Sequence, residues 1–370
     1  MYTQMILGAI AGLSLFLYGM QLMGDGLQKV AGEGLKGIIR RLTKNPLMSV
    51  LVGMFVTTII QSSSATTVMV VGFVNAGLMT LAQAVGVVFG ANIGTTITGQ
   101  MVSFNLSQWA PIVIAAGLVA NMLTKNPKVK EASEIFIGFG ILFIGMSTLS
   151  NSLEPLKELP EFTNWILQYG SNPFIGVGIG LLMTLVLQSS SATIGVLIAL
   201  ASQGVLPITT AVFIIFGDNI GTCTTALISS LGTSRRGKQV ALFHLMINII
   251  GTIYFMLFLR GILVNVVESI DPGNVARQIA NAHTIFNIVN VIVLFPFTNL
   301  LVKLIQVIIP DSEDEEESIT RYLDKRILVT PSIALENTMY EFAAMAQETI
   351  QALDNAVGAA RNRDKKLVKK

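Results

Sequence analysis

One six-residue sequence, QSSSAT, occurs twice in the chain. It begins at Gln61 and again at Gln188, 127 residues later. The same spacing places FGANIGT of the first half on FGDNIGT of the second. Over 54 ungapped positions that begin at Asn45 and Asn172, 21 residues are identical. A match of this length at one fixed spacing indicates an internal repeat, so the chain is two copies of one unit with additions.

The composition indicates that this unit lies in a membrane. Hydrophobic residues make up 52% of the chain and charged residues 12%, about half the charged share of a typical soluble domain. A net charge of +2 is too small to predict a nucleic-acid partner. The single cysteine, Cys223, excludes an intrachain disulfide and a cysteine-based metal cluster. We therefore expect a polytopic membrane protein, embedded in the lipid bilayer.

The first membrane span is predicted at residues 4–24, which are apolar and uncharged and long enough to cross the bilayer. A cleaved signal peptide is the competing interpretation, but the basic segment and cleavage site that it requires are missing. Residues 25–44 form a predominantly basic loop, which the positive-inside rule places in the cytoplasm. The N-terminus is therefore predicted to lie outside.

A re-entrant hairpin is predicted at 46–79. Two apolar pieces, 46–60 and 65–79, flank the polar QSSS, and a 15-residue helix of about 22 Å is shorter than the roughly 30 Å hydrocarbon core. A polar tip at membrane depth has to line a cavity or lie buried in protein. The alternative is one tilted helix of 34 residues with its hydroxyls on a packing face.

Two further spans, 81–103 and 108–123, complete the first unit, and 81–103 is expected to break between Gly90 and Thr96. Three spans are an odd number, so the second unit must enter the membrane in the opposite direction. The loop charges agree with this inversion, because corresponding loops of the two units differ in charge. The loop after 135–150 is acidic where its counterpart, 25–44, is basic. The loop 231–239 carries Arg235, Arg236 and Lys238, whereas its counterpart around 104–107 is uncharged.

The predicted fold class is therefore an all-α polytopic membrane protein of two inverted-topology repeats. Repeat 1 covers 1–130, and repeat 2 covers 131–260 with its own hairpin at 173–203 and spans at 207–230 and 240–260. An external loop and a seventh span (281–309) occupy 261–310, and 311–370 form a cytoplasmic tail. Inverted repeats with broken helices are typical of secondary transporters, whose site lies where the repeats meet.

The polar residues at the hairpin tips and broken spans predict the cargo. Their hydroxyls and amides are hard oxygen ligands, which suit alkali cations, and the helix N-termini after each QSSS suit an anion. Neither repeat core contains Lys or Arg, so an anion there needs accompanying cations. Na⁺ is the natural coupling ion, because clustered thiolates or histidines for a transition metal are missing from the sequence.

Asp218 is a carboxylate inside a predicted span, where the first copy has Ala91. We interpret it as a cation ligand or a titrating site; the alternative is a cap on a half-helix. His244 with Asn248 and His283 with Asn287 each share a helix face, and interhelical hydrogen bonding is favoured over a proton relay.

The duplicated QSSSAT with GANIGT and GDNIGT resembles the type II sodium-dependent phosphate cotransporters, including the bacterial sodium/phosphate symporters. The resemblance covers roughly residues 1–309 and implies inorganic phosphate as the substrate and Na⁺ as the coupling ion. It implies phosphate ligands among Gln61, Ser62, Ser63, Ser64, Asn92, Gln188, Ser189, Ser190, Ser191 and Asn219. For Na⁺ we expect ligands among Ser64, Thr66, Thr95, Thr96, Ser191, Thr193, Asp218, Thr222 and Thr225, with Thr224 as a neighbouring hydroxyl.

The last 60 residues differ in character. Residues 311–318 form an acidic linker, after which apolar residues recur at helical spacing and the chain ends in basic residues. This segment is similar to the opening of the PhoU-like helical domain of many bacterial relatives. One helix cannot form that bundle, so it is expected to associate with a second copy of the chain or with the inner membrane surface.

The sequence thus predicts a sodium-coupled phosphate symporter of the inner (cytoplasmic) membrane that works by alternating access, and no other cofactor. The alternatives are a Na⁺-coupled carrier of another oxyanion or carboxylate, a phosphate exporter, and a phosphate sensor without transport. An enzyme is disfavoured, because two histidines on packing faces and one buried Asp do not assemble a nucleophile, a base and an orienting group.

Overall fold

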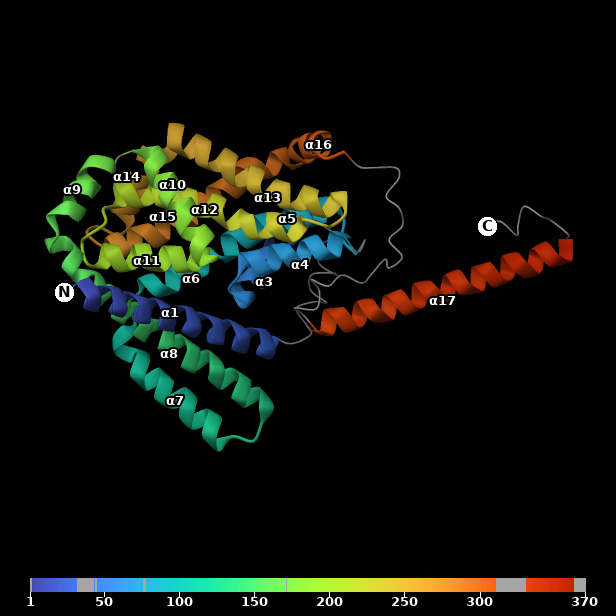
Figure 1. The fold of residues 1–370 in the computed structure, drawn as a ribbon, viewed down its shortest axis with the longest axis horizontal. Coiled ribbons are helices and arrows are strands. Elements are labelled where there is room, and N and C mark those ends of the chain that lie inside the picture. Colours follow the sequence, from blue (N-terminus) through green and yellow to red (C-terminus); the bar gives the residue numbers. More distant parts are fainter. Residues whose placement is uncertain are drawn as a thin grey trace.

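The computed structural model describes residues 2–31, 43, 45–75, 78–170, 172–310 and 331–362. Every regular element in these ranges is helical, and all the helices except the last gather into one elongated bundle (Figure 1). Six of the described segments are long and apolar enough to cross a bilayer, so the protein is a multi-pass membrane protein. These segments are Tyr2–Ala31, Leu81–Ser103, Pro127–Glu158, Ile208–Ser230, Arg235–Ile270 and Val275–Ile308.

The first half of the chain begins with α1 (Tyr2–Ala31), which continues past the predicted end of the first span at residue 24. Two shorter helices, α3 (Pro46–Ile60) and α4 (Ser63–Asn75), follow. The next segment divides into α5 (Leu81–Gly94) and α6 (Thr96–Ser103), so the predicted break lies at Thr95. A 3₁₀ turn (Ser107–Trp109) leads into α7 (Ala110–Leu123). The predicted span at 108–123 is therefore one of the shorter apolar helices.

The second half repeats this order. α8 (Pro127–Leu153) is followed by a 3₁₀ turn (Glu154–Glu158) and by α9 (Pro160–Tyr169), a helix that the sequence reasoning did not predict. α10 (Pro173–Leu187) and α11 (Ser190–Ser202) correspond to α3 and α4. Unlike α5 and α6, α12 (Ile208–Ser230) is continuous. α13 (Arg235–Tyr254) continues through a π-helical turn (Phe255–Leu259) into α14 (Arg260–Ile270).

The remaining helices have no counterpart in the repeat. α15 (Val275–Leu294), a 3₁₀ turn (Phe295–Phe297) and α16 (Thr298–Ile308) form the last apolar segment. α17 (Pro331–Asn362) extends away from the bundle (Figure 1). Its apolar residues from Leu335 to Val357 are exposed. The acidic linker and the basic end of the chain lie outside the described residues.

The sequence determines where α3 and α10 begin. Asn45 and Asn172 precede a proline at the first helical position, where the missing proline N–H costs no hydrogen bond. The Asn45 side chain accepts a hydrogen bond from Leu47 N at 2.9 Å, and the Asn172 side chain accepts one from Phe174 N at 3.0 Å. Each Asn-Pro pair is therefore a helix start.

α3 packs backbone to backbone against α5, and α10 packs in the same way against α12. A Cβ added to Gly90 of α5 would lie 1.9 Å from the Val50 carbonyl oxygen of α3. A Cβ added to Gly217 of α12 would lie 1.9 Å from the Val177 oxygen of α10. Since 217 − 90 = 127, the two close contacts follow the repeat. Only glycine permits this approach, which is common between helices in membranes.

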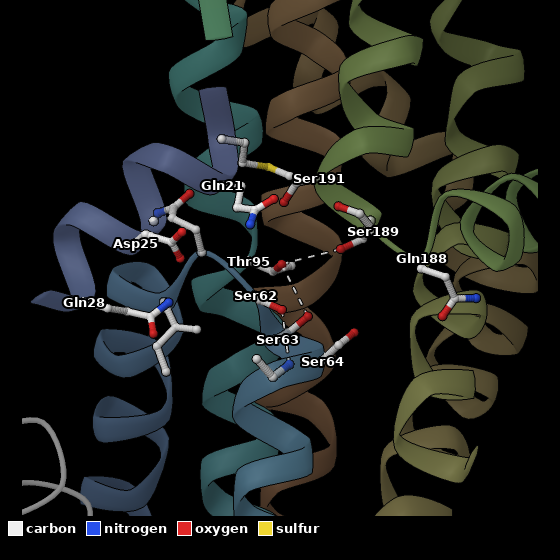
Figure 2. A pocket seen from close by; sticks show the side chains of 16 residues that line it. Gln21, Asp25, Gln28, Ser62, Ser63, Ser64, Thr95, Gln188, Ser189 and Ser191 are labelled. Carbon is white, nitrogen blue, oxygen red and sulfur yellow. Dashed lines mark hydrogen bonds between the residues drawn. The ribbon is translucent and has the colours of Figure 1, made fainter. Parts of the chain in front are cut away.

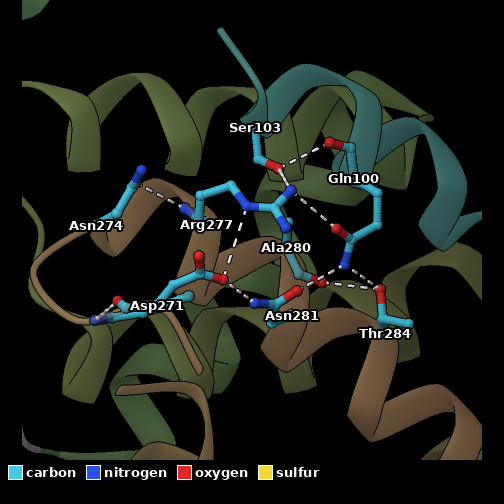
Figure 3. Close-up of polar contacts among 9 residues, drawn as sticks. Gln100, Ser103, Asp271, Asn274, Arg277, Ala280, Asn281 and Thr284 are labelled. Carbon is cyan, nitrogen blue, oxygen red and sulfur yellow. Dashed lines mark hydrogen bonds and ion pairs between the residues drawn. The ribbon is translucent and has the colours of Figure 1, made fainter. Parts of the chain in front are cut away.

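A polar cluster joins the end of α6 to the start of α15 (Figure 3). The Arg277 guanidinium donates to Ser103 Oγ at 3.0 Å and to Gln100 Oε1 at 3.3 Å, and it lies 3.7 Å from the Asp271 carboxylate. Gln100 Nε2 also donates to Asn281 Oδ1 at 3.1 Å. We call these five residues the Arg277 cluster; it fixes α6 to the α14–α15 connection.

Candidate functional site

Each QSSS sequence forms a break between two helices. Gln61 and Gln188 adopt the left-handed backbone conformation, with φ of 58° and 53°, which ends α3 and α10. The following serine begins the next helix: Ser62 Oγ accepts from Ala65 N at 3.1 Å and Ser189 Oγ from Ala192 N at 3.2 Å. The motif thus encodes a helix stop and a helix start in two residues.

A threonine pair ties the two helices together behind each tip. The Oγ1 atoms of Thr57 and Thr66 lie 2.9 Å apart, and those of Thr184 and Thr193 lie 3.0 Å apart. Both residues of the second pair are 127 positions after those of the first. Each pair joins residues nine apart across a helix break, so the chain turns back on itself at both QSSS sequences.

Thr95, at the break between α5 and α6, lies between the two tips (Figure 2). Ser63 Oγ donates to Thr95 Oγ1 at 3.4 Å, and Thr95 Oγ1 lies 3.5 Å from Ser190 Oγ. These separations are at the long end of hydrogen bonding, so the three hydroxyls are adjacent without being tightly held. The two copies of the motif therefore meet at one place, although 95 residues separate Thr95 from Ser190.

A cavity of about 290 Å³ lies at this meeting point, roughly ten times the ~30 Å³ that one water occupies in the liquid. The described residues that line it carry hydroxyls, amides and one carboxylate, and no Lys, Arg or His is among them. They are Met20, Gln21, Gly24, Asp25, Gln28, Ile60, Gln61, Ser62, Ser63, Ser64, Ala65, Thr95, Gln188, Ser189, Ser190 and Ser191. All eight residues of the two QSSS sequences are brought together, with Thr95.

The sequence reasoning missed the wall that α1 contributes. Gln21, Asp25 and Gln28 line the cavity, although the prediction placed Asp25 in the loop 25–44. That boundary was wrong, because α1 continues to Ala31. The spacing i, i+4, i+7 puts the three polar residues on one helix face, and this pattern was the signal that could have found them.

Asp218 lies outside the cavity lining, buried beside the threonine pair of the second copy. Its side chain is fully buried, and Oδ1 accepts a hydrogen bond from Thr184 Oγ1 at 2.6 Å. Thr184 Oγ1 also lies 2.9 Å from the Gly180 carbonyl oxygen. A hydroxyl has one proton, so when Thr184 donates to the carboxylate it accepts from Thr193 and does not donate to that carbonyl. Asp218 Oδ2 has no hydrogen-bond partner among the described atoms. A buried carboxylate oxygen with free lone pairs is a ligand for a cation or a proton.

The first copy has no carboxylate at this position. Thr57 and Thr66 form the same pair, but Ala91 stands where the second copy has Asp218. Neither Thr57 nor Thr184 was predicted as a site residue, whereas their partners Thr66 and Thr193 were.

The other predicted ligands make internal bonds away from the cavity. Asn92 Oδ1 lies 2.9 Å from His244 Nε2, and Asn92 Nδ2 donates to Asn248 Oδ1 at 3.2 Å. His244 thus makes the interhelical hydrogen bond expected of it, whereas both ring nitrogens of His283 are without a partner among the described atoms. Side chains that donate to carbonyl oxygens near them in sequence are Thr66, Thr96, Asn219, Thr222, Thr224 and Thr225.

Among the described residues, no group of three His, Cys, Asp or Glu side chains is placed to hold a metal ion. Cys223 is buried, and its thiol lies 3.4 Å from the Asn219 carbonyl oxygen. The chemistry at the cavity is therefore that of neutral oxygen ligands, backbone N–H groups and one carboxylate.

Comparison with known proteins identifies the family. The model of the Na+/Pi-cotransporter family matches residues 15–151 and again 152–270. "Uncharacterized protein YqeW" of Bacillus subtilis is 30% identical over 295 residues, which cover 80% of this chain and 95% of that protein. "Putative inorganic phosphate export protein YjbB" of Escherichia coli is 23% identical over 368 residues, 98% of this chain and 67% of that protein.

A mammalian relative is more distant. "Sodium-dependent phosphate transport protein 2A" of Rattus norvegicus is 23% identical over 379 residues, which cover 65% of this chain and 58% of that protein. The comparison with solved structures gave no match. With the family model covering well over half of the chain, the protein belongs to the Na+/Pi-cotransporter family, a family of membrane transporters and not of enzymes.

Proposed function

We propose that this protein carries inorganic phosphate across the cytoplasmic membrane together with Na⁺, by alternating access. The observation that carries the proposal is the meeting of both QSSS tips at one cavity through Thr95. The family and the printed names of its relatives supply phosphate and sodium as cargo.

The proposed phosphate site is the cavity itself. The first turns of α4 and α11 begin there, and their backbone N–H groups and the serine hydroxyls are donors that suit an anion. The proposed ligands are therefore Gln61, Ser62, Ser63, Ser64, Gln188, Ser189, Ser190 and Ser191. Asn92 and Asn219, whose side chains bond within the protein, are proposed to hold α5 and α12 in position instead.

The proposed Na⁺ sites use the remaining oxygen ligands. Asp218, Thr184 and Thr193 form one candidate site, because the free carboxylate oxygen there is buried without a compensating charge. Ser64, Thr95 and Ser191 are candidates beside the phosphate. Thr66, Thr96, Thr222 and Thr225 join this set only if their present bonds to carbonyl oxygens rearrange. The described lining of the cavity has no Lys, Arg or His, so cations are needed there to offset the charge of phosphate.

We propose the inverted topology for the architecture, with repeat 1 at 1–130 and repeat 2 at 131–260. α3 and α10 have 15 residues each, so their length of about 22 Å is too short to span and supports re-entrant hairpins at 46–79 and 173–203. Loop charges place the N-terminus outside and the tail 311–370 in the cytoplasm. Alternating access would then exchange the conformations of the two halves.

The test is uptake of radiolabelled phosphate into proteoliposomes under an inward Na⁺ gradient, compared with an equal K⁺ gradient. We expect phosphate to accumulate under the Na⁺ gradient and not under the K⁺ gradient. We expect this accumulation to be lost in Ser63→Ala and in Ser190→Ala. Ser269→Ala is the control, since Ser269 is exposed on α14 and bonds to the Asn265 carbonyl oxygen. Phosphate binding without accumulation under either gradient would contradict the transporter and favour a sensor.

Export of phosphate is the second candidate, favoured by the printed name of the Escherichia coli relative. Efflux from preloaded proteoliposomes that exceeds uptake at matched gradients would identify it. Competition by sulfate or succinate would instead identify a carrier of another oxyanion or of a carboxylate.

A further inference from the structure

We propose that Asp25 is a cation ligand in the cavity and that its charge prevents phosphate from binding there without a cation. The inference rests on the proposed function and adds a residue and a coupling step to it. It starts from the position of Asp25, which lies on α1 across the cavity from Ser62 and Thr95 (Figure 2).

Asp25 is the one charged side chain among the described residues that line the cavity. The next basic residue along α1, Lys29, interacts electrostatically with Asp25, but its Nζ donates its hydrogen bond to Glu134 Oε2 of α8 at 2.6 Å. Asp25 makes no hydrogen bond or ion pair with any described residue, and it is only partly buried. No described side chain occupies its carboxylate oxygens, so they are available to a cation that enters the cavity.

The groups beside Asp25 complete a hard-oxygen ligand set. Gln21 and Gln28 flank it on the same face of α1, and Ser62 of the first tip lines the same cavity. Carboxylate, amide and hydroxyl oxygens suit a hard cation such as Na⁺. The same carboxylate repels phosphate, so the anion binds well only when a cation lies between them. A repulsive group that acts against the wrong loading state is a source of specificity.

The second copy shows that the fold does not need this charge. α8 corresponds to α1 at a spacing of 126, which places Gly145 on Gly19 and Asn151 on Asp25. Asp25→Asn therefore installs the residue that the other copy has at this position. It removes the charge and keeps the shape of the side chain. Asp25→Glu keeps the charge and serves as the second variant.

The experiment measures equilibrium binding of radiolabelled Na⁺ and of radiolabelled phosphate to the purified full-length protein, with uptake measured in parallel. In Asp25→Asn we expect Na⁺ affinity without phosphate to fall by about tenfold or more, and phosphate affinity without Na⁺ to rise by about tenfold, which corresponds to about 1.4 kcal/mol. Asp25→Glu should retain the dependence on Na⁺. Glu158→Gln, which neutralises an exposed acid that does not line the cavity, should behave as wild type.

The outcomes separate the two proposals. Wild-type protein without Na⁺-dependent uptake would overturn the proposed function. Wild-type uptake that depends on Na⁺, with the same dependence in Asp25→Asn, would overturn the inference alone, because the Asp25 charge would then play no part in coupling phosphate to Na⁺. Weaker phosphate binding without Na⁺ in folded Asp25→Asn would also refute it, since removal of a repulsive charge cannot weaken an anion site.

Discussion

A single methyl group at Gly180 of α10 should separate the second hairpin from α12. A Cβ there would lie 1.9 Å from the Ile214 carbonyl oxygen, and ordinary contact begins at 3.4 Å, so the helices would have to part by 3.4 − 1.9 = 1.5 Å. Overpacking costs about 1–3 kcal/mol. Thr184 lies one turn further on the same face, so its 2.6 Å bond to Asp218 would also break, which adds about 1–3 kcal/mol for the unpaired carboxylate.

The matched control is Gly178→Ala on the same helix, where an added Cβ meets nothing within 4 Å. There alanine should leave stability unchanged or raise it by up to about 1 kcal/mol through helix propensity. The assay is the thermal unfolding midpoint of the purified protein, together with the Na⁺ concentration for half-maximal phosphate uptake. Gly180→Ala should lower the unfolding midpoint and raise the Na⁺ concentration needed for half-maximal uptake. Equal midpoints and equal Na⁺ dependence for the two variants would refute the backbone contact.

Three further substitutions test other parts of the site. Thr95→Val should abolish most phosphate uptake. It should change the free energy of unfolding by less than about 1 kcal/mol, because the hydrogen bonds that it removes are long. Uptake near the wild-type rate would contradict a role for Thr95 between the tips. Gln188→Gly should leave the stability unchanged or raise it by up to about 1 kcal/mol, since glycine adopts the left-handed conformation without strain. A lower unfolding midpoint would instead show that the glutamine side chain stabilises the turn. His244→Ala should destabilise by about 2–4 kcal/mol, because it leaves Asn92 unpaired beside a void, and a changed Na⁺ dependence would argue against a purely structural histidine.

The helix breaks at the two motifs could be predicted because the sequence repeats the same stop and start residues. Gln61 and Gln188 end their helices, and Ser62 and Ser189 begin the next ones. Thr95 was predicted as a Na⁺ ligand, but its contact with the second tip was not predicted. Thr95 is brought to Ser190 by tertiary packing, which neither residue's neighbours in the sequence indicate.

The errors have physical causes as well. Asp25 was assigned to a loop because a charge usually ends an apolar run, but a helix continues through a charge that faces a polar cavity. The break expected in α12 does not occur, because Asn219 and Thr222 donate to the Ile215 and Asp218 carbonyl oxygens one turn earlier. Their polar groups are thereby satisfied inside an intact helix.

The Arg277 cluster gives α6 a mechanical role. At one end of this eight-residue helix, Thr98 Oγ1 donates to Gln61 Oε1 of the first tip at 2.6 Å. At the other end, Gln100 and Ser103 are fixed to Arg277 of α15 (Figure 3). A helix of this length is a stiff body of about 12 Å, so a force that displaces the tip is transmitted along α6 to the α14–α15 connection. Movement at the cavity and movement at that connection are therefore expected to occur together.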